Sequence, residues 1–330
     1  MPGMISHYLC GELSAARLSG SGIGGLIERN RQIYNLGTQG PDFFFYYIPC
    51  LIRPSIYRLG NLIHNSRVSE FFRSMLEHSM KLTGGEREAA LSYICGYLTH
   101  YALDGNAHPY IYYKSGFKTE GDSRPSLHYS IRHQSFETNV DIEMLKLAAS
   151  QEPADKRLWR LIRVSRLQAA GAASVISSGL SDVYGIKLGK RSVYRAMSSM
   201  VTITRLLQSR TGRRKRLIGS VEGLLMKESG YVSSLIHDQR TDGQDYLNLR
   251  REPWAYPWDN PNEDSSLQSH AFTDMFQKSV DDSVRLIESF DCLLRGEVDL
   301  DAFLDMIGNN SFTTGRDWQV KLDFLYHAHI

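Results

Sequence analysis

The chain has 330 residues, of which 42% are hydrophobic and 22% are charged, a composition that is ordinary for a soluble globular protein and excludes general disorder. Lys and Arg number 38 against 36 Asp and Glu, and the resulting net charge of +2 gives no overall positive field that would attract nucleic acid. The four cysteines are far apart and form no CxxC pair, which excludes a disulfide-rich scaffold and a cysteine-based zinc site.

The N-terminal sequence has neither the basic start nor the apolar centre of a secretory signal. No apolar run along the chain approaches the ~20 residues that span a bilayer. We therefore expect a cytoplasmic protein, unless a signal was removed before this numbering begins.

Helical periodicity dominates the sequence. In residues 86–104, Ala90, Ile94, Leu98 and Tyr101 recur at three- and four-residue spacing and form one apolar stripe. Similar patterns predict helices over 66–82, 132–150, 155–180, 192–209, 215–229 and 268–295. Strand-like alternation is short and rare, so we expect an all-α fold. The aromatic run 43–48 follows Gly40-Pro41-Asp42 and is predicted to be a buried turn.

Prolines and glycines predict where these helices begin and end. Gly84-Gly85 marks the start of one helix, and Pro109 is expected to end it, because the residue before a proline is disfavoured in the α conformation. Segment 115–126 is predicted to be a polar loop. Segment 251–266, with three prolines and two tryptophans, is excluded from regular helix and is expected to form a packed Ω-loop.

Histidines and carboxylates recur at metal-ligand spacing in the first half of the chain. His100, Asp104 and His108 lie four residues apart in turn, and His133 and Glu137 repeat that spacing. Residues at i and i+4 lie on one face of a helix, about 40° apart around its axis. A single pair of this kind is usually a surface ion pair, but two in succession favour a metal site. Imidazole and carboxylate without thiolate are typical of catalytic zinc.

A series of motifs in the first 145 residues resembles, in order, the motifs of the bacterial zinc-dependent phospholipase C family. They read Ser6-His7, Leu36-Gly37-Thr38-Gln39-Gly40-Pro41-Asp42, Leu59-Gly60-Asn61-Leu62-Ile63-His64, Gly96-Tyr97-Leu98-Thr99-His100-Tyr101-Ala102-Leu103-Asp104, Ala107-His108-Pro109-Tyr110 and His133-Gln134-Ser135-Phe136-Glu137-Thr138-Asn139. Beyond residue 150 the similarity is limited to scattered features such as Asn310-Ser311-Phe312-Thr313-Thr314-Gly315.

The resemblance implies an all-α, multi-helix bundle of the phospholipase C and P1 nuclease type, with additional C-terminal helices. Residues 1–150 would form the metal-binding core. Residues 151–330 would be a helical continuation packed on it, with a single domain as the alternative.

The resemblance also implies up to three Zn²⁺ ions at the bottom of a cleft. The ligands carried over are Asp42, His64, His100 and Asp104 for the first zinc, His108, His133 and Glu137 for the second, and His7 with the other oxygen of Asp104 for the third. Secreted relatives complete the third site with an N-terminal tryptophan. Here His7 lies close to Met1 without a tryptophan, so this site has water or the Pro2 amine as its remaining ligands, or is empty.

The function implied is a zinc-dependent hydrolase that cleaves a phosphodiester of phospholipase C type with metal-activated hydroxide. Asp42 is expected to be a metal ligand and, as a further role, the general base. The substrate class includes phospholipids. The basic run within 210–216 is expected to be a solvated loop, and its alternative role is peripheral contact with a membrane. A nuclease or nucleotidase of the same fold and a non-catalytic metal-binding protein are the alternatives. Stable nucleic-acid binding is not expected.

Other polar residues are expected to lie outside the metal cluster. His78 and His270 are expected at the surface, and His128 in a loop. Asp141 continues the His133 and Glu137 stripe one turn further and is expected to cap a helix or pair with another side chain.

Overall fold

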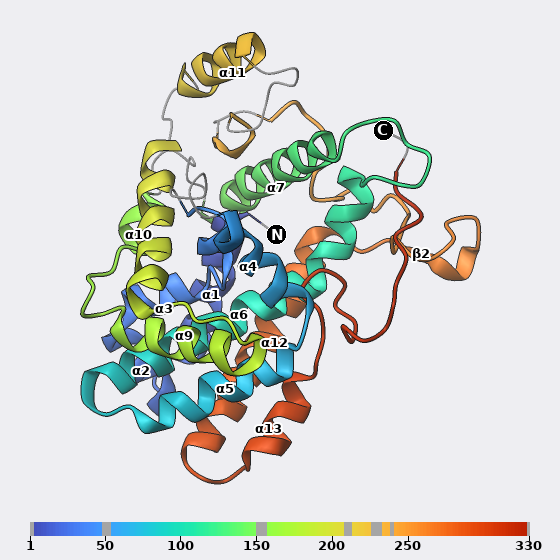
Figure 1. The fold of residues 1–330 in the computed structure, drawn as a ribbon. Helices are drawn as coiled ribbons and strands as arrows, with labels where there is room; N and C mark the ends of the chain where they lie inside the picture. The colour runs from blue at the N-terminus through green and yellow to red at the C-terminus, as the bar shows by residue number, and fades with distance from the viewer. Residues whose placement is uncertain are drawn as a thin grey trace.

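The computed structural model describes residues 3–47, 54–149, 157–207, 213–225, 233–237 and 241–328. Within these residues the chain is an assembly of α-helices, as predicted, with one short antiparallel ribbon beside them (Figure 1). The elements in chain order are α1 (Met4–Arg17), α2 (Gly22–Arg29), α3 (Arg31–Gly37), η1 (Asp42–Phe44), α4 (Pro54–Asn65), α5 (Val68–Lys81), α6 (Gly84–Ser115), α7 (Ser126–Ala149), α8 (Leu158–Leu161), α9 (Ala170–Tyr184), α10 (Lys190–Leu207), α11 (Arg213–Leu225), η3 (Ser233–Leu235), β1 (Trp254–Ala255), η4 (Asp264–Ser266), β2 (Leu267–Gln268), α12 (Phe272–Leu294) and α13 (Leu300–Ile307).

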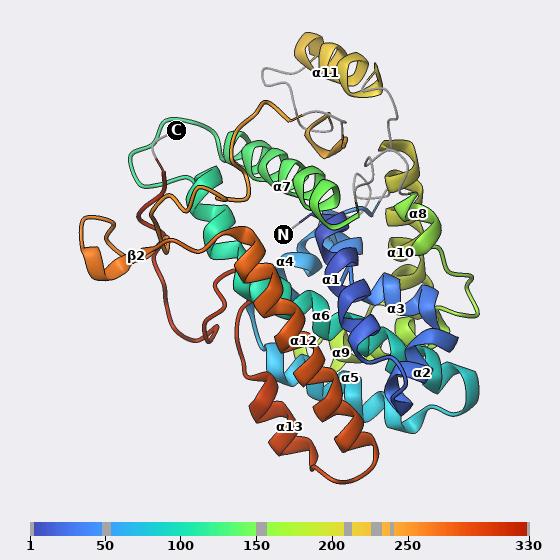
Figure 2. The ribbon, with the colours of Figure 1, turned by 180° about the vertical axis from the view of Figure 1, so that it is seen from behind.

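Helix α6 is the centre of the fold. It contacts α1, α3, α5, α7, α9 and α12, which surround it in both views (Figures 1 and 2). The close approach of α3 depends on two glycines, because a Cβ on Gly96 would lie 2.2 Å from the Tyr34 carbonyl oxygen and one on Gly37 would lie 2.3 Å from that of Tyr93. Backbone contact of this kind fixes the position of α6 along its axis and its rotation about that axis, and therefore the positions of its polar residues.

The prediction that Pro109 ends this helix is wrong, since α6 continues to Ser115. Proline lacks the N–H that would bond to the carbonyl of Gly105, and a proline in a helix interior costs about 3 kcal/mol. Here Ala107, His108, Pro109 and Tyr110 are all buried, so packing on several sides offsets that cost. The helix ends instead at Gly116, which has a φ of 78°.

Two further expectations about elements need correction. The pattern over 155–180 is interrupted in the described residues, where it forms α8 and α9 with a loop between them. The basic run is not a loop over Arg213 and Arg214, because α11 begins at Arg213, two residues before the helix predicted over 215–229; Arg210 lies outside the described residues. The expected boundary near residue 150 also lies outside them.

The loop predicted over 115–126 is one residue shorter at each end, since Ser115 ends α6 and Ser126 begins α7, and the segment 251–266 contains no α-helix. In the second, Trp254 in β1 pairs with Gln268 in β2, and the rings of Tyr256 and Trp258 stack at 5.2 Å. No helix among the described residues combines the length and apolar character needed to cross a membrane.

Candidate metal centre

The structure gathers all eight predicted donor residues from five elements. His7 comes from α1, Asp42 from η1 and His64 from α4. The remaining donors are His100, Asp104 and His108 on one face of α6, and His133 and Glu137 on one face of α7. All of them are buried except His133, whose side chain is 15% exposed.

Four of these side chains converge on one point. Asp42 Oδ1 lies 3.2 Å from His64 Nε2 and 3.7 Å from His100 Nε2. The two imidazole nitrogens are 3.4 Å apart. Asp104 Oδ2 is 3.4 Å from the first and 3.1 Å from the second.

These separations are those of tetrahedral zinc ligands. Donors about 2.0–2.1 Å from a tetrahedral zinc lie roughly 3.3 Å from one another. The donor set, two imidazoles and two carboxylates, is also one that zinc accepts. The five separations given above, between 3.1 and 3.7 Å, are therefore close to those that a zinc ion needs.

A second group of donors lies where α6 faces α7. His133 Nε2 is 2.8 Å from Glu137 Oε1, and His108 Nε2 is 3.9 Å from the same oxygen. One ligand atom from each of the three residues lies within 4.8 Å of the others. Three protein ligands are typical of a catalytic zinc that keeps an open position.

Asp104 links the two groups and His7. While its Oδ2 faces His64 and His100, its Oδ1 lies 3.2 Å from His7 Nε2 and 3.7 Å from His108 Nδ1. The His7 ring stacks on that of His100 at 4.1 Å. The two carboxylate oxygens thus point toward different sets of donors, as a bridging ligand requires.

Several polar atoms in this centre are buried without a hydrogen bond. They are both ring nitrogens of His7, both carboxylate oxygens of Asp104 and Oδ1 of Asp42. Imidazole nitrogens lie near the Asp104 oxygens, His7 Nε2 at 3.2 Å from Oδ1 and His100 Nε2 at 3.1 Å from Oδ2. Buried polar groups are nearly always paired, because leaving one unpaired costs roughly 1–3 kcal/mol. A cation at this point is the partner that such atoms require.

Hydrogen bonds on the outer side of the rings orient four of the imidazoles. The Nδ1 atoms of His64, His100 and His108 lie 2.7, 3.3 and 2.8 Å from the carbonyl oxygens of Gly60, Thr38 and Phe312 respectively. His133 Nδ1 lies 3.2 Å from Ser115 Oγ. An N–H donated from Nδ1 leaves the Nε2 lone pair directed at the centre, which is the usual outer support of a metal-bound histidine.

Phe312 is a residue of the centre that the sequence did not identify. Its carbonyl oxygen faces His108 Nδ1 at 2.8 Å, and its N–H donates to the His64 carbonyl oxygen at 2.9 Å. Its ring lies 4.9 Å from that of His64 and 5.7 Å from that of His100. The only signal was its place in the segment 310–315, whose similarity to bacterial relatives pointed to no role.

Burial and charge set the protonation of these groups. Burial lowers the pKa of His100, His108 and His133, which favours the neutral imidazole that a metal needs. Burial also acts to lower the pKa of His64, but the carboxylates of Asp104 and Asp42 outweigh it and raise that pKa to about 9.

The carboxylate of Asp104 is stabilised by its neighbours. Burial is the largest influence on it and raises its pKa, yet the neighbouring imidazoles of His100, His108 and His64 hold that pKa well below its ordinary value. Asp104 is therefore ionised, which is the form that a metal ligand takes.

Asp141 both caps and pairs, as predicted. Its Oδ2 accepts from the Ile5 N–H at 2.9 Å and lies 2.9 Å from His237 Nε2, and its Oδ1 accepts from the N–H and the Oγ–H of Ser6 at 2.8 and 2.6 Å. The carboxylate is fully buried. It ties the first turn of α1, and thus His7, to α7 next to Glu137.

The other histidines lie away from the centre. His78 is 31% exposed at its side chain and contacts Asp182 at 2.8 Å, and His270 is exposed, both as predicted. The expectation of a loop position for His128 is wrong, because α7 begins at Ser126, two residues earlier than His128. It lies in the first turn of that helix, which Pro125 precedes.

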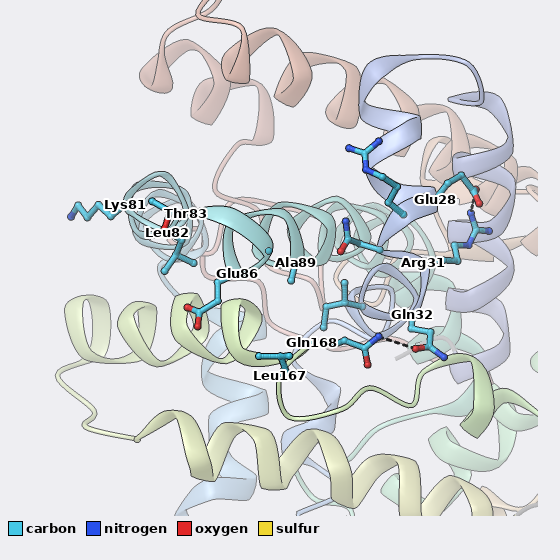
Figure 3. Close-up of a pocket in the computed structure, with 14 residues that line it drawn as sticks. Glu28, Arg31, Gln32, Lys81, Leu82, Thr83, Glu86, Ala89, Leu167 and Gln168 are labelled. Carbon is cyan, nitrogen blue, oxygen red and sulfur yellow. Dashed lines mark hydrogen bonds and ion pairs between the residues drawn. The ribbon is translucent and has the colours of Figure 1, made fainter.

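A pocket on another part of the surface does not belong to the metal centre. Figure 3 shows its lining, with Glu28 and Arg31 paired at 2.7 Å and Gln32 and Gln168 hydrogen-bonded at 3.2 Å. From α6 it includes residues up to Ala89, about 16 Å along the helix from His100. None of the eight donors lines it.

Comparison with known proteins agrees with this geometry. A family model described as zinc dependent phospholipase C matches residues 6–175, which is just over half of the chain and contains all eight donor residues. Searches of curated proteins and of solved structures returned no significant match. The fold is all-α and the histidine and aspartate clusters suit zinc. The chain belongs to the zinc-dependent phospholipase C family.

Proposed function

We propose that this protein hydrolyses a phosphodiester, with phospholipids as the substrate class, at a zinc centre built from the eight donor residues. The observation that carries the proposal is the spacing of Asp42, His64, His100 and Asp104, whose donor atoms lie 3.1–3.7 Å apart. Membership of the zinc-dependent phospholipase C family supports a zinc hydrolase.

Two zinc sites follow from the donor sets. The first would be held by Asp42, His64, His100 and Asp104. The second would be held by His108, His133 and Glu137. His7 faces the free oxygen of Asp104 at 3.2 Å and would serve a third.

Zinc at such sites supplies a lowered pKa for bound water and neutralisation of charge on the phosphoryl oxygens. The protein supplies orientation, because the carbonyl oxygens of Gly60, Thr38 and Phe312 hold the three imidazoles by their Nδ1 atoms. It also excludes bulk water from the first site, where the side chains of His64, His100 and Asp104 are at most 4% exposed. Substrate would enter from the side of α7, where the side chains of His133 and Glu137 are 15% and 10% exposed.

Asp42 would accept the proton of the attacking water. Its Oδ1 faces His64 and His100, so we assign that oxygen to the metal and the carboxylate as a whole to orienting or deprotonating the attacking water. Tyr112 would form part of the substrate wall, since its ring lies 4.5 Å from that of His133 and packs on Phe324.

A panel of phosphodiesters tests the proposal. It contains a phospholipid, a nucleotide diester, single-stranded nucleic acid and a bis-aryl phosphate, each with and without a chelator. We expect turnover of the phospholipid that chelation abolishes and zinc restores. His100→Ala should reduce it to background, while His78→Ala, a histidine outside the centre, should retain it.

Three outcomes would contradict the proposal. Turnover of nucleic acid in preference to lipid would identify a nuclease, and zinc binding without any turnover would identify a non-catalytic metal protein. Equal activity of His100→Ala and wild type, with both folded by circular dichroism, would place the chemistry elsewhere.

A further inference from the structure

Helix α11 is set apart from the body of the protein. Figures 1 and 2 show it at the edge of the molecule, beyond α7. Among the described elements it contacts η3. It also bonds to the end of α10, where Arg214 donates to the Leu206 carbonyl oxygen at 3.2 Å.

One face of α11 is anchored toward the metal centre. Glu222 is buried and accepts from the N–H and Oγ–H of Ser233 at 3.3 and 2.7 Å. Ser234 in turn bonds to α7, with its carbonyl accepting from Thr138 at 2.8 Å and its hydroxyl donating to Gln134 at 3.3 Å. Both of these α7 residues are sequence neighbours of the proposed ligands. The helix is thus one element removed from the side on which substrate would enter.

The opposite face of α11 presents large apolar side chains to solvent. Leu217, Val221 and Leu224 are 67%, 45% and 85% exposed. Their spacing of four and three residues places them on one stripe. Leu206, at the end of α10, is a further exposed leucine, at 62%, and its carbonyl oxygen accepts from Arg214 at 3.2 Å.

Basic residues flank this stripe at the start of the helix. Arg213, Arg214, Lys215 and Arg216 are consecutive, and the first turn contains no acidic residue. Cations at a helix N-terminus oppose the helix dipole and cost stability. The whole chain is nearly neutral, at +2, so this concentration of positive charge is local to the start of α11.

We infer that α11 is an interfacial helix that docks the protein on an anionic phospholipid surface, with Leu217, Val221 and Leu224 in the acyl boundary and the arginines at the headgroups. An exposed apolar stripe bordered by basic residues is the pattern of helices that lie in the membrane interface. The positive charge is complementary to an anionic lipid surface. The inference extends the proposed function, since such a surface would present phospholipid beside the α7 entrance.

Co-sedimentation of the full chain with vesicles tests this inference. Phosphatidylcholine vesicles are used with and without phosphatidylglycerol. We expect the protein to sediment with the anionic vesicles, with or without chelator, because α11 contributes no donor to the metal centre. Each basic residue near an anionic surface contributes about 1 kcal/mol, so Arg213→Gln/Arg216→Gln should weaken binding about 30-fold at low salt. Leu217→Ser/Leu224→Ser should weaken it on both vesicle types.

The controls replace two other leucines that are more than half exposed and lie outside α11. Leu249 and Leu325 are 55% and 58% exposed, and Leu249→Ser/Leu325→Ser should bind as wild type. Hydrolysis of a bis-aryl phosphate by the α11 variants should be unchanged, while their turnover of vesicle lipid falls. Vesicle binding without any turnover would contradict the proposed function and leave the docking surface supported.

Two results would overturn the inference. One is sedimentation of the α11 variants equal to that of wild type. The other is a concentration-dependent dimer in solution that Leu217→Ser/Leu224→Ser abolishes, since a second copy of the chain would then be what covers this face.

Discussion

Removing the carboxylate of Asp141 should destabilise the fold more than the loss of an ordinary helix cap. Asp141→Ala leaves the buried N–H groups of Ile5 and Ser6 without their acceptor and removes the contact with His237. An N-cap contributes about 1 kcal/mol, and hydrogen bonds to a buried charged group contribute roughly 1.5–3 kcal/mol each. Because these bonds share one carboxylate and are not additive, we expect a loss of about 3–4 kcal/mol in the free energy of unfolding.

Urea denaturation of the metal-free protein, followed by circular dichroism, measures this loss. The matched control is Asp299→Ala, because Asp299 caps α13 through a single bond to the Ala302 N–H at 2.8 Å on the surface. That variant should lose about 1 kcal/mol. If Asp141→Ala lowers the free energy of unfolding no more than Asp299→Ala does, the four hydrogen bonds of Asp141 do not hold α1, and with it His7, in place.

The remaining predictions concern the glycine beside the centre, the buried thiols and the effect of pH. Gly40 has a φ of 51°, and a Cβ there would lie 2.2 Å from His100 Cδ2. Gly40→Ala should therefore displace the His100 ring and weaken zinc affinity by more than tenfold in a competition titration. Gly121→Ala, at a glycine of positive φ in open space, should leave the zinc affinity intact. Burial raises the pKa of Cys10 to about 12 and also raises that of Cys95. Iodoacetamide at pH 8 should therefore alkylate neither thiol until the protein unfolds, which peptide mass spectrometry would measure. Rapid labelling of either thiol in the native protein would contradict their burial. The pKa of His64 is raised to about 9 against an ordinary 6.5. Its contribution to the stability of the metal-free protein is therefore complete below pH 6.5 and is lost as the pH rises through about 9. If the urea midpoint of His64→Gln falls as steeply over this pH range as that of wild type, another group is responsible.

The local part of the centre could be predicted from the sequence. The spacing of His100, Asp104 and His108 needs only helical geometry, and the same holds for His133 and Glu137. The resemblance to the family then added Asp42 and His64 from separate motifs. The structure brings all of them together, and their assignment as zinc ligands is part of the proposed function.

Features that depend on distant parts of the chain could not be predicted. The carbonyl oxygen of Phe312 faces His108 across 204 residues, and no local pattern encodes that contact. Similarly, α6 passes through Pro109 because burial from several neighbours offsets the missing hydrogen bond, whereas the proline alone predicts an end. The helix predicted over 215–229 begins two residues earlier, at Arg213, because a run of like charges at a helix start contradicts the ordinary preferences.

Crystals grown with zinc, and diffraction measured on either side of the zinc absorption edge, test the central claim most directly. We expect one anomalous peak about 2.0–2.2 Å from the donor atoms of Asp42, His64, His100 and Asp104, and a second among His108, His133 and Glu137. Peaks confined to surface groups such as His78, with no zinc bound to Asp104, would contradict it.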